Sequence, residues 1–168
     1  MSIKIKLLEA PDIPRVMSAF LNSEWHTPEF YFEALLAAQD KGERIVIVAH
    51  SSSKIAGFVT IKWKSDYPPF AEKGIPEIND LRVLAEFRRR GIATALVNEA
   101  ERRIFKRSLV AGIAVGLYSD YGPAQRMYIR RGYIPDGRGL MYNKLPVNPG
   151  HDVFVDDALL LYFVKERK

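Results

Sequence analysis

The stretch LRVLAEFRRRGIAT, residues 81–94, is the part of this sequence that decides its fold. Its first three residues end a run that is typical of a β-strand, 77–83, and its last four begin a helix that extends to about residue 106. The free amide groups and the positive end of the dipole of that helix face the loop between the two elements. The stretch therefore predicts a strand, a loop and a helix that together form an anion-binding site.

Three consecutive arginines, Arg88, Arg89 and Arg90, stand at the start of this helix. A cation at the positive end of a helix costs about 0.3 kcal/mol or more, so three arginines there indicate an anion between the side chains and the helix. Gly91 and the small Ala93 leave room for backbone amides to surround two adjacent phosphates, as a pyrophosphate requires. The alternative is that the arginines form only a solvated helix start.

The rest of the chain predicts alternating helices and strands around this junction. A Pro-rich segment, 67–70, and the segment 137–157 are expected to be loops, the second an extended loop or a hairpin. The fold class is α/β, with a mixed central sheet and helices on both faces. The predicted strands are 3–7, 44–49, 55–63, 77–83, 110–117 and 158–164, and the predicted helices follow Pro14, Pro28, Gly91 and Gly122.

Length and composition limit the kind of protein that this can be. A chain of 168 residues predicts a single domain, 1–168, and its 48% hydrophobic and 27% charged residues are typical of globular proteins. The absence of cysteine excludes disulfides, thiolate metal sites and a cysteine nucleophile. A net charge of +5 favours a polyanionic partner, which could be nucleic acid, a membrane surface or a phosphorylated cofactor. No apolar run reaches the roughly 20 residues of a membrane helix, and we expect a cytoplasmic protein.

Two motifs resemble those of the GCN5-related N-acetyltransferases. Residues 88–93, RRRGIA, are similar to the family signature of Arg or Gln, two variable residues, Gly, one variable residue, and Gly or Ala. Residues 124–133, AQRMYIRRGY, are similar to its second motif, which contains Ala, Leu-Tyr and Gly-Phe. The resemblance covers most of the chain. It implies an enzyme that transfers an acetyl group directly from acetyl-coenzyme A to a primary amine. No metal site is expected, because the three histidines, at positions 26, 50 and 151, lie far apart without metal-ligand spacing.

The resemblance also implies roles for individual residues. Backbone amides near Leu81 and Val83 would hold the pantetheine arm and the thioester carbonyl, and Ile78 and Leu81, three residues apart, predict a bulge in this strand. Tyr128 would protonate the departing thiolate, and Glu77, or a water that it orders, would accept the amine proton, with Asp80 or Asp120 as alternatives. The remaining cofactor contacts are expected from the loop and the helix that follows it, and from a tyrosine before the second motif: Arg88, Arg89, Arg90, Gly91, Ile92, Ala93, Thr94 and Tyr121.

Tyr121 stands where the family often has an asparagine, so its contact with the cofactor is a departure from the pattern. The acceptor is a small molecule or a protein whose identity the sequence does not give, and the protein is expected to be a monomer or a homodimer without nucleic-acid or membrane partners. Two alternatives are a coenzyme A-binding sensor without turnover and a basic nucleic-acid-binding module. A set of aromatic and acidic residues would line the acceptor cleft and suit a cationic amine: Trp25, His26, Tyr31, Tyr67, Phe70, Tyr118, Asp120 and Tyr121.

Overall fold

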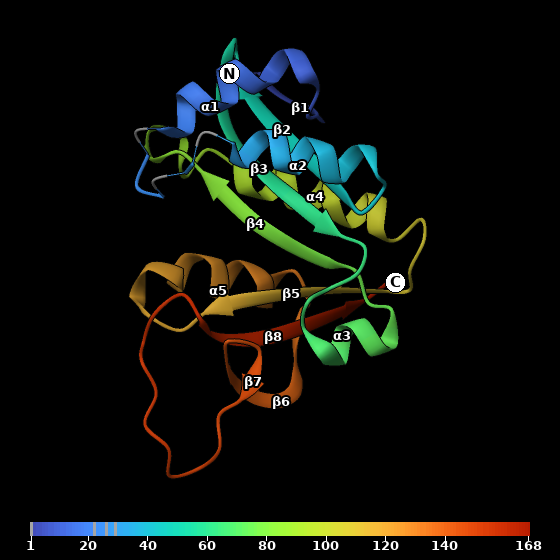
Figure 1. Ribbon diagram of the computed structural model, residues 1–168, viewed down its shortest axis with the longest axis vertical. Helices are drawn as coiled ribbons and strands as arrows, with labels where there is room; N and C mark the ends of the chain where they lie inside the picture. Colours follow the sequence, from blue (N-terminus) through green and yellow to red (C-terminus); the bar gives the residue numbers. More distant parts are fainter. Residues whose placement is uncertain (1, 22, 26, 29) are drawn as a thin grey trace. The chain divides into compact units, whose positions relative to one another are not determined.

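The computed structural model describes residues 2–21, 23–25, 27–28 and 30–168. By its internal contacts the chain falls into two compact units, one formed by residues 1–63 and 78–106 and the other by residues 64–77 and 107–168 (Figure 1). Each unit carries four strands that lie side by side, in the order β1-β2-β3-β4 in the first and β5-β8-β6-β7 in the second.

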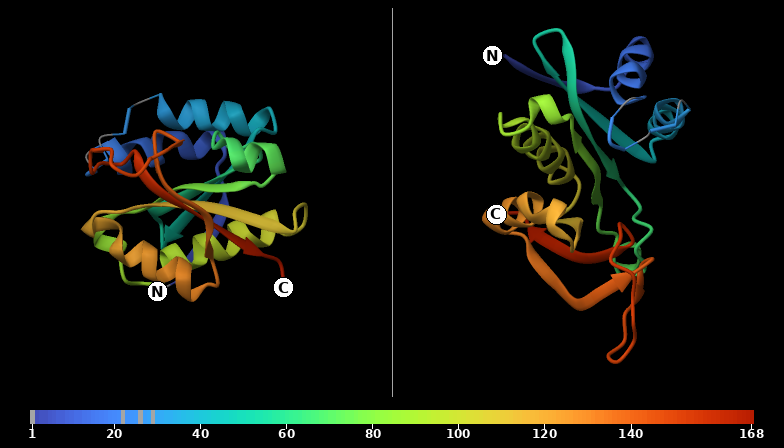
Figure 2. Two further views of the ribbon diagram at one scale, coloured as in Figure 1. Left: turned by 90° about the horizontal axis from the view of Figure 1, so that it is seen from below. Right: turned by 90° about the vertical axis from the view of Figure 1, so that its left-hand side faces the viewer.

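The first unit is built on an antiparallel meander. β1 pairs with β2 and β2 with β3, with Ile5 opposite Ala49 and Ile47 opposite Val59. Helices α1 and α2 cover one face of these strands and α4 covers the other (Figure 2), so the predicted helices on both faces are present here. The elements are β1 (Ile3–Leu7), η1 (Ala10–Asp12), α1 (Ile13–Leu21), α2 (Tyr31–Asp40), β2 (Arg44–Ser51), β3 (Lys54–Lys62), β4 (Glu77–Val83), η2 (Ala85–Phe87) and α4 (Ile92–Ile104).

The core of the first unit is formed largely by the strands that are rich in β-branched residues. Every residue of β3 from Ile55 to Ile61 is buried, as are the apolar side chains of α4 that face the sheet, Ile92, Leu96, Ala100 and Ile104. The helix stripe predicted from the spacing of these four residues is therefore confirmed.

The second unit is an antiparallel arrangement around β8. β8 pairs with β5 on one side and with β6 on the other, and the closing strand expected at 158–164 is confirmed. Its elements are α3 (Pro68–Lys73), β5 (Val110–Gly116), η3 (Ser119–Tyr121), α5 (Gly122–Arg130), β6 (Ile134–Tyr142), β7 (Leu145–Pro146) and β8 (Leu159–Glu166). Within the described ranges, no helix of either unit is long and apolar enough to cross a membrane.

The Pro-rich segment differs from the expected loop, whereas the segment 137–157 contains a hairpin, one of the two forms expected for it. Residues 68–73 form the short helix α3, because the two prolines occupy its first turn, where a missing N–H costs nothing, and Gly74 ends it with φ 62°. Residues 134–142 form β6, which pairs in a hairpin with the two-residue strand β7. The sequence conceals β6 because Pro135, Gly137 and Gly139 interrupt its pattern, and the pairing with β8 shifts register between Pro135 and Leu140.

Candidate active site

The middle of strand β4 (Glu77–Val83) has an irregular backbone between Ile78 and Leu81, where the sequence predicts a bulge. Asp80 has φ 51°, a left-handed conformation that breaks the alternation of side chains between Ile78 and Leu81. The neighbouring strand β3 carries Gly57 beside this segment, where a Cβ would lie 2.5 Å from the carbonyl oxygen of Arg82. Glycine at position 57 thus lets the β4 backbone approach β3 closely, a role that the sequence analysis did not identify.

The loop after β4 presents backbone amides at the start of α4. Arg89 has φ 58° and Gly91 has φ 80°, and Gly91 is the N-cap residue of the helix. The first intrahelical hydrogen bond is donated by the Ala95 amide to the Gly91 carbonyl, 2.9 Å apart. The amides of residues 92–94 therefore have no carbonyl acceptor within the helix. These amides and the dipole of a 13-residue helix provide a positive end for an anion.

The three arginines of this loop are not equivalent. The Arg88 Nε donates to the Val83 carbonyl at 3.0 Å, and its guanidinium pairs with Glu24 and lies 5.6 Å from the centroid of the Trp25 ring. Arg90 lies over the Phe87 ring at 5.9 Å. Arg89 is exposed and makes no hydrogen bond, ion pair or ring contact with any residue that the structure describes. Its guanidinium is therefore the most available of the three for a phosphate.

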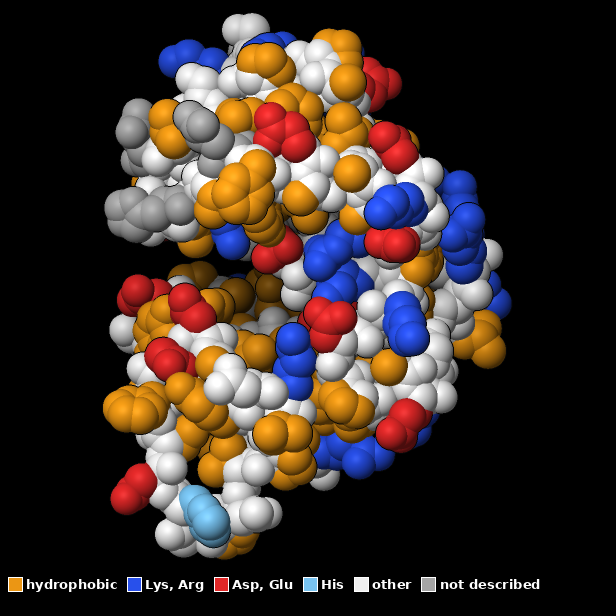
Figure 3. Space-filling model, viewed as in Figure 1, with side chains coloured by type: hydrophobic (Ala, Val, Ile, Leu, Met, Phe, Trp, Pro, Cys, Tyr) orange, Lys and Arg blue, Asp and Glu red, His pale blue; other side chains and the backbone are white. Residues whose placement is uncertain are grey.

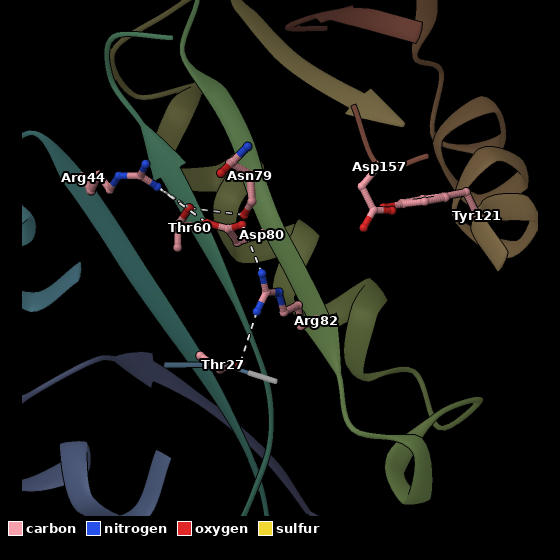
Figure 4. Close-up of polar contacts among 8 residues, drawn as sticks. All are labelled: Thr27, Arg44, Thr60, Asn79, Asp80, Arg82, Tyr121 and Asp157. Carbon is pink, nitrogen blue, oxygen red and sulfur yellow. Dashed lines mark hydrogen bonds and ion pairs between the residues drawn. The ribbon is translucent and has the colours of Figure 1, made fainter. Parts of the chain in front are cut away.

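Tyr121, in the second unit, is held at the N-terminus of α5. Its ring lies against Gly116 at the end of β5, where a Cβ would meet ring carbons at 2.3 Å, and its hydroxyl donates to Asp157 at 2.8 Å. Figure 4 draws the Tyr121 side chain reaching Asp157. Burial, followed by the hydrogen bond to Asp157, raises the pKa of the Tyr121 hydroxyl. The ring therefore has a fixed orientation at the start of this helix.

Tyr128 lies on the inward face of α5, as expected from the spacing of the helix. Only 4% of its surface is exposed, and burial raises the pKa of its hydroxyl. A tyrosine in this environment stays protonated over the whole range of ordinary assays, which is the state that a general acid requires.

Glu77 is a buried carboxylate at the start of β4. It is 5% exposed and accepts a hydrogen bond from the Ser65 hydroxyl, while the same serine oxygen accepts from the Tyr67 amide at 3.0 Å. Of the two alternative bases, Asp80 pairs with Arg44 and Arg82, and Asp120 is exposed on η3.

Two members of the expected acceptor-cleft set lie elsewhere. Tyr67 and Phe70 are 1% and 2% exposed and form the core of the second unit, with Tyr67 stacked on Tyr162 at 3.6 Å between ring centroids. They pack because α3 replaces the expected loop and turns both rings inward. His26 lies outside the described residues. No group of three or more potential metal ligands occurs among the residues described.

The family model for the acetyltransferase (GNAT) family matches residues 11–133. The chain belongs to that family. Its predicted activity class, an acetyl-CoA-dependent N-acetyltransferase, is confirmed at the level of the family, and the matched range includes the β4–α4 junction and the whole second motif, 124–133.

Solved structures of GNAT acetyltransferases share the fold. An N-acetyltransferase from Staphylococcus aureus Mu50 aligns with a TM-score of 0.73 at 13% identity over 99% of both chains. A ribosomal-protein-alanine N-acetyltransferase from Brucella melitensis gives 0.70 at 16% identity, covering 98% of this chain and 99% of the other. The PaiA N-acetyltransferase from Thermoplasma acidophilum, in complex with coenzyme A, gives 0.65 at 16% identity over 99% and 100%. No curated protein matches the chain.

The predicted GNAT-type α/β fold is thus confirmed, while the residues that carry the GNAT chemistry remain predictions. The sequence analysis did not identify the residues that contact the β4 backbone, the arginines of β4 and of the following loop, and the Tyr121 ring. A signal was present for two of these residues, because an isolated glycine inside a strand pattern indicates close approach of another backbone or ring. The residues missed are Glu24, Thr27, Arg44, Gly57, Thr60, Arg82 and Gly116.

Proposed function

We propose that this GNAT protein transfers the acetyl group of acetyl-CoA directly to a primary amine. The observation that supports the proposal best is the start of α4, where the amides of residues 92–94, the left-handed Gly91 and the available guanidinium of Arg89 converge on one loop. A pyrophosphate needs several donors around two neighbouring groups, and this loop supplies both amides and charge.

The proposed binding of the thioester follows from β4. The amides of Leu81 and Val83 would donate to the pantetheine and the thioester carbonyl, and the left-handed Asp80 immediately before them supports this by turning the strand out of regular alternation. When the amine attacks the carbonyl carbon, negative charge develops on the carbonyl oxygen. An amide already directed at that oxygen stabilises the charge without reorganisation.

Two proton transfers complete the proposed reaction. The amine loses a proton, for which we propose Glu77 or a water that it orders, because Asp80 is shared by two arginines. The carbon–sulfur bond breaks as the tetrahedral intermediate collapses, and the thiolate of coenzyme A gains a proton from Tyr128. Burial keeps that hydroxyl protonated until it is needed.

The test is thiol release from acetyl-CoA with a panel of primary amines and peptide N-termini. Because the chain has no cysteine, a thiol-specific reagent such as Ellman's reagent reads only free coenzyme A. We expect release that depends on both enzyme and amine, and that falls in Tyr128→Phe. Acetyl-CoA binding without release with any amine would contradict the proposal and favour the sensor without turnover.

On the face shown in Figure 3, acidic and basic side chains are intermixed, which does not favour the nucleic-acid alternative.

A further inference from the structure

The residue between the two proposed amide donors of β4 is Arg82, and its side chain has an unusual setting in the first unit. Its guanidinium lies 5.7 Å from the ring centroid of Trp25, 5.4 Å from that of Tyr31 and 5.7 Å from that of Phe58. Three aromatic rings thus surround one guanidinium, and cation–π attraction holds it in place. Arg82 is therefore oriented before any ligand arrives.

Toward the residues that the structure describes, Arg82 uses little of its hydrogen-bonding capacity. A guanidinium has five N–H donors. Arg82 gives one to the Thr27 hydroxyl at 3.3 Å, and the carboxylate oxygen of Asp80, with which it pairs, is 3.8 Å away, beyond hydrogen-bonding distance (Figure 4). The side chain is 21% exposed, so solvent or a ligand can reach it. An oriented guanidinium with unused donors suits a planar, two-oxygen anion.

A second arginine makes this cluster electropositive. Arg44 of β2 lies 3.7 Å from the other carboxylate oxygen of Asp80, and it donates to the Thr60 hydroxyl at 3.2 Å (Figure 4). Asp80 is the one carboxylate paired with either arginine among the residues described, so the cluster carries two positive charges and one negative charge. Burial, and then the charge and hydrogen bond of Asp80, raise the pKa of Tyr31, which keeps that hydroxyl neutral as well.

We infer that Arg82, supported by Arg44, binds a carboxylate of the acceptor, so that the substrate class is an amine that also carries a carboxylate, as a free amino acid does. The inference rests on the proposed function, because it places the acceptor beside the β4 amides of Leu81 and Val83. The anion belongs to the acceptor and not to the cofactor, since the phosphates have their own donors at residues 89–94. An acceptor with both an amine and a carboxylate takes the place of the purely cationic amine that the aromatic and acidic residues suggested.

The experiment uses binding of the acetylated product, which does not depend on turnover. In a Trp63→Phe background, Trp25 is the single tryptophan and lies against Arg82, so its emission reports the cluster. N-acetyl-L-leucine, whose carboxylate is its one charged group, is titrated beside N-acetyl-L-leucinamide, which has the same shape without the charge. We expect saturable binding of the acid, at least about tenfold tighter than the amide.

Variants assign the effect to Arg82. Arg82→Gln is expected to remove the preference for the acid and leave acetyl-CoA affinity within twofold, while Arg82→Lys, which keeps the charge but not the planar fork, retains a smaller preference. Arg15→Gln removes an exposed arginine of α1 and is the matched control, with the preference intact. Equal binding of acid and amide, a preference that survives Arg82→Gln, or competition by inorganic phosphate at lower concentration than the acid would each overturn the inference.

The two proposals fail separately. If amines without a carboxylate release thiol and N-acetyl-L-leucine does not bind, acetyl transfer stands and the carboxylate inference is wrong. If the acid binds through Arg82 but no amine releases thiol, the carboxylate site stands and the proposed transfer is wrong.

Discussion

Replacing Gly57 with alanine tests whether close approach of β3 and β4 shapes β4, the strand that we propose binds the cofactor. The added Cβ would lie 2.5 Å from the Arg82 carbonyl oxygen and 3.2 Å from the Val83 Cα, whereas real Cβ contacts begin at 3.0 Å. The β4 backbone must therefore shift by at least 0.5 Å (3.0 minus 2.5), and the obstacle is backbone, which cannot rotate away. Overpacking of this kind costs about 1–3 kcal/mol of unfolding free energy.

Two measurements follow from this shift. For a chain of this length, the melting temperature is expected to fall by roughly 2–12 °C. The same shift moves the proposed amide donors at Leu81 and Val83, and losing one such hydrogen bond, worth about 1 kcal/mol, weakens acetyl-CoA binding roughly fivefold. Gly122→Ala is the matched control, since that residue is helical with nothing within 4 Å of its would-be Cβ, and its stability should be unchanged or higher. Wild-type melting and affinity in Gly57→Ala would refute the reasoning.

Three further predictions concern single side chains. Tyr128→Phe is expected to lower kcat about 100-fold with acetyl-CoA affinity nearly unchanged, and an unaltered rate across the pH range would exclude Tyr128 as the acid. Gly116→Ala should displace the Tyr121 ring, which a Cβ would meet at 2.3 Å, and weaken acetyl-CoA binding measured by calorimetry; unchanged affinity would remove Tyr121 from the cofactor site. Burial, and then the charge of Lys6, lower the pKa of His50. The contribution of His50 to the free energy of unfolding is therefore complete above about pH 6.5, and it is lost as the pH falls from that value toward the lowered pKa of the folded state. His50→Leu should flatten the pH dependence of the denaturant midpoint in this window, and an unchanged dependence on pH would contradict the assignment.

The sequence predicted the elements whose signals are local. The strand before residue 84, the loop of arginines and the helix from Gly91 each depend on neighbouring residues, and the structure has them within one or two positions. α3 was missed because two prolines concealed a helical first turn. The hairpin of β6 and β7 was expected only as an alternative to a loop at 137–157, and its start at Ile134 was not predicted because Pro135, Gly137 and Gly139 interrupt the strand pattern.

The side-chain environment of the site could not be predicted to the same extent. Three neighbouring residues of the same type have different surroundings: Arg88 pairs with Glu24, Arg89 is exposed, and Arg90 lies over the Phe87 ring. These differences depend on a partner from a distant segment and on the backbone conformation of the loop, which the sequence does not show. The setting of Arg82 likewise needs rings from three separate segments, so no local pattern reveals it.

The central claim is that the start of α4 binds the pyrophosphate of acetyl-CoA, and calorimetric titration tests it most directly. Wild-type protein, Arg89→Glu and the charge-matched control Arg15→Glu are titrated with acetyl-CoA, beside a short DNA duplex at the same salt concentration. We predict one-to-one saturable binding of acetyl-CoA, at least about tenfold weaker in Arg89→Glu and unchanged in Arg15→Glu, with no comparable binding of DNA. No saturable binding of acetyl-CoA, or equal affinity in Arg89→Glu, would contradict the claim.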